Sequence, residues 1–110
     1  MLEKELKEKI LHFQENEITE HFIYKHLAKK AKGKNKEILK RIGNDELRHY
    51  NEWKKFTGED VKPRKLFILK YLLIAKIFGL TFSLKLMEKG ERNAEKAYRE
   101  IQNYIQRQRR

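Results

Sequence analysis

Apolar residues recur every three or four positions through three long stretches of this chain, and this spacing is the strongest constraint on its fold. Because an α-helix turns once every 3.6 residues, the spacing lines one face of a helix with apolar side chains. No stretch alternates convincingly between apolar and polar residues, as a half-buried strand does. The spacing therefore predicts an all-α chain.

Helix-breaking residues divide the chain. The stretches "KGKN" at 32–35 and "TGEDVKP" at 57–63 interrupt the pattern, and Pro63 suits the start of a new helix. A further break is expected near Gly79. The chain of 110 residues has the size of one domain, so we expect a single helical domain over 1–110. We expect its helices at about residues 2–31, 35–56 and 64–106.

Each predicted helix carries a charged or titratable residue on its apolar stripe. The stripes comprise Leu6, Ile10, Phe13, Glu17, Glu20, Tyr24, Leu27 and Ala31; Leu39, Ile42, Glu46, His49, Trp53 and Phe56; and Ile77, Leu80, Leu84, Met87, Glu91, Ala94, Tyr98, Ile101 and Ile105. A buried carboxylate costs several kcal/mol without a compensating cation or hydrogen bonds. One such residue would commonly reach water at the edge of a stripe, but packed helices bring all of them to one level. A shared polyvalent cation would compensate all of them at once.

The kind of metal site follows from the residue types and their spacing. The chain has no cysteine, so carboxylate and imidazole are its strong ligands. The pair Glu46 and His49 lies one helical turn apart on one face. Helical bundles that hold two metals take such a Glu-x-x-His pair from a helix next to one that supplies a single Glu. Glu17 with Glu46 and His49 fits half of that arrangement.

The first and third helices look like copies of one another at an offset of 74 residues. The offset places Glu17 on Glu91 and Tyr24 on Tyr98, together with three apolar pairs of the stripes. This pattern indicates an internal duplication of a helix pair. The counterpart of Glu46 would then lie near position 120, beyond the end of the printed sequence, so one chain is expected to lack a second Glu-x-x-His pair.

Three segments resemble the rubrerythrin-like branch of the ferritin-like diiron carboxylate proteins: "FQENEITEHFIYKHLAKKA", "NDELRHYNEW" and "FGLTFSLKLMEKGERNAEKAY". Within that branch they are similar to the ferritin-like domains attached to vacuolar-type iron and manganese transporters. The resemblance implies a four-helix bundle that binds two iron ions and reacts them with oxygen or peroxide. It also implies a ligand set, which consists of Glu17, Glu46, His49 and Glu91, with Glu20 and Glu88 as additional ligands.

The chain departs from that family in lacking a fourth helix. A three-helix chain could complete the bundle in two ways: two copies could pair across a two-fold axis, or the third helix could swap between chains. Either way we expect at least a homodimer. Tyr24 lies two turns beyond Glu17 on the same stripe, where its hydroxyl could hydrogen-bond a ligand carboxylate or carry a proton. An amphipathic core residue is an equally good interpretation of Tyr24.

Charge and hydropathy leave other functions open. The formal net charge is +11, and because the lysines are scattered over every segment, a solvated lysine-rich surface is the simpler interpretation. The alternative is a basic helical adaptor for an acidic membrane surface or for nucleic acid, and nucleic acid is not expected as a partner. A ferritin-like fragment that no longer holds metal is a third reading. The apolar stretch 66–87 contains three lysines, which makes membrane spanning unfavourable; lying on a membrane, or burial against another helix, fits better. We expect a cytoplasmic protein, with manganese as the alternative to iron, ferroxidase or peroxidase activity, and an electron donor of unspecified kind.

Overall fold

The computed structural model of the protein describes residues 3–89, 99, 103 and 106–107. Its elements are α1 (Lys4–Lys30), α2 (Gly33–Thr57), α3 (Lys65–Phe78) and a further helical segment over residues 80–89. No strand occurs among the described residues, which confirms the all-α prediction for that part of the chain. The count of three helices is not confirmed, because Gly79 divides the third expected helix into two within the described residues.

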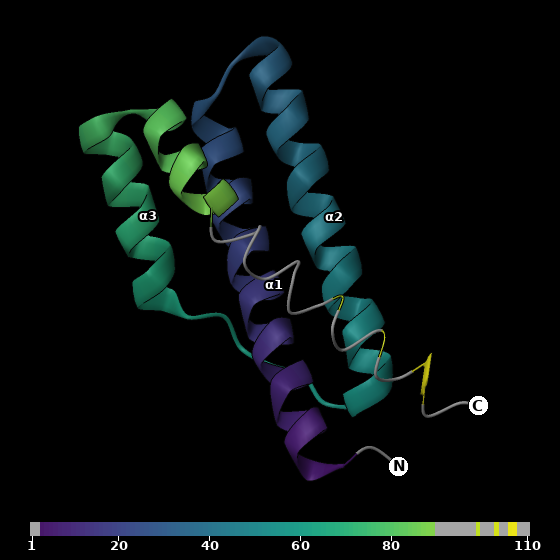
Figure 1. The fold of residues 1–110 in the computed structure, drawn as a ribbon. Coiled ribbons are helices and arrows are strands. Elements are labelled where there is room, and N and C mark those ends of the chain that lie inside the picture. Colours follow the sequence, from purple (N-terminus) through teal and green to yellow (C-terminus); the bar gives the residue numbers. More distant parts are fainter. Residues whose placement is uncertain (1–2, 90–98, 100–102, 104–105, 108–110) are drawn as a thin grey trace.

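α1 and α2 form an antiparallel hairpin (Figure 1). Near its closed end the two backbones approach closely, since a Cβ added at Gly43 of α2 would lie 3.3 Å from the Cβ of Tyr24 on α1. Near its open end Phe13 stacks on Trp53 with 5.6 Å between the ring centroids. The stripes predicted from the sequence thus face one another across most of this helix pair.

The segment between α2 and α3 lies against α1. Gly58 ends α2 in the left-handed conformation, with a φ of 68° and its N–H donating to the Lys54 carbonyl at 2.7 Å. Polar side chains of α1 then bind the segment: Gln14 Nε2 donates to the Glu59 carbonyl at 2.8 Å, and Thr19 Oγ1 accepts from the Arg64 N–H at 3.0 Å. These bonds place α3 beside α1 (Figure 1).

The chain reverses at Gly79, whose φ of 96° favours glycine. Residues 80–89 return along the bundle, and Met87 enters a core cluster with Ile23, Leu27 and Leu39. The break changes the phase of the predicted third stripe, so Leu84 is half-buried while Ile77 is exposed. The burial predicted from the stripes was wrong for Ile77. It was also wrong for Phe56, which is exposed one residue before the end of α2. Its continuation lies outside the described residues: Glu91, Ala94, Tyr98, Ile101 and Ile105.

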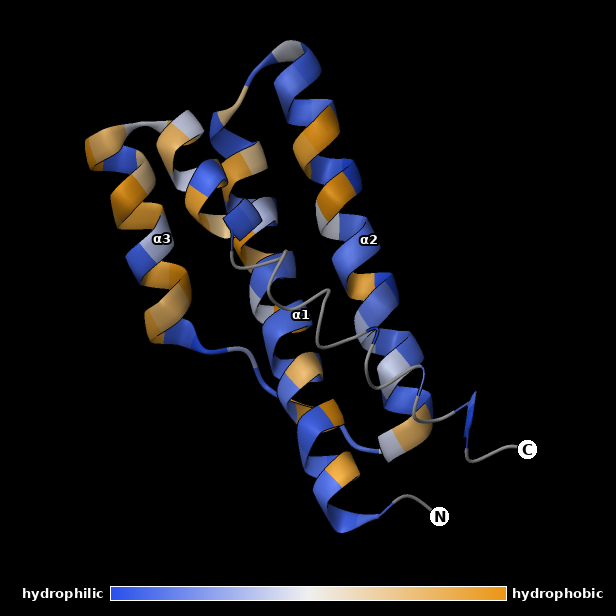
Figure 2. Ribbon diagram, in the orientation of Figure 1, coloured by the Kyte–Doolittle hydropathy of each residue, from blue (hydrophilic) through white to orange (hydrophobic). Residues whose placement is uncertain are grey.

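Apolar residues are placed differently on the two sides of the bundle (Figure 2). Along α1 and α2 they alternate with hydrophilic residues, whereas most residues of α3 are hydrophobic. Five large apolar side chains of α3 are exposed along its length, four of them aliphatic and the fifth Phe78. Within the part of the chain that the structure describes, no helix combines the length and the apolar character that crossing a bilayer requires.

Candidate metal centre

Three ligand-type side chains meet between α1 and α2: Glu17, Glu46 and His49. Glu17 lies one turn after Phe13, and His49 lies one turn before Trp53, so the stacked aromatic pair closes one side of the group. The core cluster around Tyr24 and Leu39 lies on the other side. The group is therefore a polar layer between two apolar layers of the helix pair.

The three residues can present one ligand atom each with all of these atoms within 4.8 Å of one another. Within the group, His49 Nδ1 lies 3.6 Å from Glu17 Oε2. Bonds from a divalent metal to nitrogen or oxygen measure about 2.0–2.2 Å, so ligands sharing one ion lie at most about 4.4 Å apart. The 3.6 Å separation already fits a common ion, and small side-chain rotations would bring the whole group into range.

Burial varies across the group. Glu46 is 8% exposed, the Glu17 side chain is 17% exposed, and the His49 side chain is 38% exposed. The carboxylates therefore lie toward the interior, while the imidazole side opens to solvent.

The donor set is chemically suited to iron or manganese, which carboxylate and imidazole ligands both accommodate. Three protein ligands leave a divalent ion of this kind with open positions. The solvent side at His49 is where further ligands would enter.

Two other acidic residues predicted as ligands lie outside the three-residue group. Glu20 is half-buried on α1, and its negative charge, after the larger effect of burial, raises the pKa of the Tyr71 hydroxyl on α3. Glu88 is exposed and lines a groove of about 320 Å³ together with Tyr24. Tyr24 itself is buried in the core cluster. Glu91 lies outside the described residues.

Some positioning residues were not predicted. His21 Nδ1 lies 2.7 Å from the Gly43 carbonyl, and since a carbonyl only accepts, Nδ1 carries the proton. This bond ties α1 to α2 one turn before Glu46. Gln14 and Thr19 are buried although they lie off the stripe, because the segment before α3 covers them. The sequence carries no signal for their burial, which depends on the path of that segment.

Comparison with known protein families, with curated proteins and with solved structures finds no match to this chain.

Proposed function

We propose that this protein binds iron at Glu17, Glu46 and His49 as half of a diiron carboxylate centre and reacts it with oxygen or peroxide. Manganese is the alternative metal, since the same ligands suit both. The proposal rests on one observation, the meeting of a Glu from α1 with a Glu-x-x-His pair from α2 inside a helical hairpin. The ferritin-like family implied by the sequence resemblance uses the same ligand types in the same helical arrangement.

A second copy of the chain completes the centre in this proposal. Three donors are half of what two metals take in a bundle of this kind. A two-fold axis past the solvent side of His49 would add the same three residues again. The other source of ligands is Glu91, if the third helix expected from the sequence (about 64–106) is swapped between chains. Glu20 and Glu88 are additional carboxylates.

The three ligands and the residues around them have distinct roles in this centre. Glu46, the most buried of the three, holds negative charge in the interior, where a metal ion is its strongest partner. Its charge and that of Glu17 compensate the metal, while His49 supplies a neutral nitrogen. When bound, a pair of iron ions supplies two electrons for reducing an O–O bond. The stacked Phe13 and Trp53 exclude water from one side, and Tyr24 holds or transfers a proton at its hydroxyl.

Metal analysis of the purified protein tests the proposal. Protein loaded with ferrous iron without oxygen, then desalted, is expected to retain about one iron per chain, which is two per dimer. Glu46→Ala and His49→Ala are expected to lower the iron content severalfold. Glu52→Ala is the matched control, because Glu52 is an exposed glutamate on the same helix.

Fewer than about one iron per two chains, unchanged by Glu46→Ala, would contradict metal binding. Light scattering on the same samples measures the mass in solution, which is expected to be at least that of a dimer. A monomer that still retains iron would contradict completion by a second copy. If oxygen consumption after mixing with ferrous iron is the same for the wild type and Glu46→Ala, the proposed reactivity is wrong.

A further inference from the structure

The outward side of α3 carries a continuous apolar stripe. We call Leu66, Leu69, Leu73 and Ile77 the α3 outer face; their exposed fractions range from 54% to 83%. Their spacing of three or four residues aligns them on one side of the helix. The opposite side of α3 packs on the core through Phe67, Ile68, Tyr71, Leu72 and Ala75. α3 thus carries apolar side chains on two opposite sides, and the outward side is left exposed within the described residues.

Lysines border the α3 outer face on both edges. At 100° per residue, Lys65 and Lys76 lie on one edge of the stripe and Lys70 lies on the other. All three are exposed, and α3 contains neither Asp nor Glu. An apolar stripe between two basic edges is the pattern of a helix that lies in the interface of an anionic membrane.

The same charges disfavour a second copy as the cover. Pairing two α3 helices face to face would bring lysine edges together, with no carboxylate of α3 to compensate them. An acidic phospholipid surface instead offers negative headgroups to the lysines and an apolar layer to the leucines.

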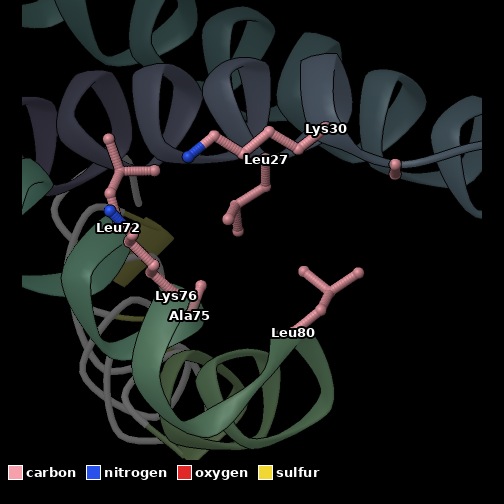
Figure 3. A pocket seen from close by; sticks show the side chains of 7 residues that line it. Leu27, Lys30, Leu72, Ala75, Lys76 and Leu80 are labelled. Carbon is pink, nitrogen blue, oxygen red and sulfur yellow. The ribbon is translucent and has the colours of Figure 1, made fainter.

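A cleft next to this face has the same combination of groups. It lies between the end of α1 and α3, has a volume of about 180 Å³, and is lined by the apolar side chains of Leu27, Ala31, Leu72, Ala75 and Leu80. Lys30 and Lys76 also line it, and in Figure 3 their side chains extend toward the same side, near Leu72. An apolar cleft with two ammonium groups suits an anionic amphiphile, which is the chemistry of an acidic phospholipid.

We propose that the α3 outer face docks on a membrane surface that contains acidic phospholipids. α3 has 14 residues, so its length of roughly 21 Å is short of the roughly 30 Å of a bilayer core. The helix therefore lies along the surface, with its four apolar side chains among the acyl chains and Lys65, Lys70 and Lys76 at the headgroups. Phe78 and Phe82, whose ring centroids are 5.4 Å apart across Gly79, lie at the end of the docked helix.

Vesicle co-sedimentation tests this docking. The full chain is expected to bind vesicles that mix phosphatidylcholine with phosphatidylglycerol and to stay unbound with phosphatidylcholine alone. Leu69→Gln with Leu73→Gln is expected to weaken binding at least about tenfold, because both leucines lose their apolar contacts. Phe56→Gln is the matched control, an exposed apolar residue on α2 that should leave binding unchanged.

Charge-reversal variants distinguish docking through the α3 outer face from general attraction between the basic chain and acidic vesicles. Lys70→Glu with Lys76→Glu is expected to weaken binding more than about tenfold, whereas Lys34→Glu with Lys40→Glu on α2 changes the net charge equally and should act far less. Equal loss in both pairs would overturn the assignment to α3. Circular dichroism and the fluorescence of the buried Trp53 establish that each variant is folded.

A second reporter keeps the test independent of the loss of binding. Leu73→Trp is expected to shift its emission to the blue when acidic vesicles are added. Vesicle binding absent in the wild type would overturn the proposal. So would a dimer that Leu69→Gln with Leu73→Gln dissociates, because a second copy would then cover the face. A third outcome would also overturn the proposal: duplex DNA releases the wild type from acidic vesicles and binds the leucine variant as tightly as the wild type. The partner would then be nucleic acid, bound without the α3 outer face.

Discussion

The α1–α2 hairpin and the α3 side of the molecule place polar and apolar groups in opposite ways. The hairpin places two carboxylates and an imidazole between its helices, with Glu46 buried and Glu17 and His49 partly buried, while α3 exposes four large aliphatic side chains. Both placements cost free energy in an isolated chain, the first through lost hydration and the second through apolar surface left in water. The two proposals made above rest on this contrast: a cation inside the hairpin, and an acidic membrane surface outside α3.

The largest expected effect comes from truncating the core on the hairpin side. Ile23→Ala removes a fully buried side chain and is expected to lower the free energy of unfolding by about 2–5 kcal/mol. Leu73→Ala on the α3 outer face should change it by less than about 0.5 kcal/mol. Urea denaturation followed by circular dichroism measures both. If Leu73→Ala proved as costly as Ile23→Ala, the α3 outer face would be covered in solution and the contrast would fail.

A smaller effect is expected from neutralising Glu46, the buried carboxylate of the three-residue group. In the presence of a chelator, Glu46→Gln should raise the free energy of unfolding by about 1 kcal/mol, because it removes a buried charge next to Glu17. Glu52→Gln, an exposed control on the same helix, should leave it unchanged. Adding ferrous iron should reverse the order and make the wild type more stable than Glu46→Gln. Destabilisation by Glu46→Gln under the chelator would show that Glu46 serves the fold rather than a metal.

The smallest effect concerns the segment that joins the two regions. Lys54 Nζ lies 2.6 Å from Asp60 Oδ1, and this hydrogen bond lowers the pKa of Asp60 and raises that of Lys54. The Asp60 contribution is present above its ordinary pKa of 3.8 and is lost as the pH falls through its lower pKa in the folded chain. The Lys54 contribution is present below 10.5 and is lost as the pH rises through its raised pKa.

Asp60→Asn is therefore expected to lower the Tm slightly at neutral pH. The size of this shift should be smaller than that of the opposite shift in Tm caused by Glu46→Gln. The difference from the wild type should shrink in strong acid, where Asp60 is protonated in both the folded and the unfolded chain. Thermal unfolding over a pH series measures this difference. A gap between the two proteins that widened toward acid would contradict the assignment to this ion pair. Because both groups are exposed, added salt should also reduce the difference.

Local sequence patterns predicted most of the helix ends and the three residues Glu17, Glu46 and His49 that meet between α1 and α2. Glycine and proline act on the backbone within a few residues, so the expected end near residue 56 lies one residue from the end of α2 at Thr57. Glu17, Glu46 and His49 could be found because helical periodicity places stripe residues on one face whatever the partner is. The break at Gly79 also falls where the 74-residue offset places the beginning of α1.

Other features could not be predicted because they depend on contacts far apart in the sequence. Gln14 is buried only because the segment at Glu59 crosses it, 45 residues later. Phe56 and Ile77 belong to regular apolar stripes and are nevertheless exposed, because Phe56 lies near the end of α2 and Ile77 lies on the side of α3 that faces away from the core. Periodicity identifies which side chains share a face, but it does not say whether another element lies opposite.

The sequence by itself determined the all-helical character of the described chain and the alignment of its carboxylates and histidine with the apolar stripes. Both depend on interactions within a few turns of one helix. The tertiary structure decided that Glu17 meets Glu46 and His49, through the close approach of α1 and α2 at Gly43. It also decided that α3 turns an apolar face outward, because its other side already fills the core and no described helix lies beyond it.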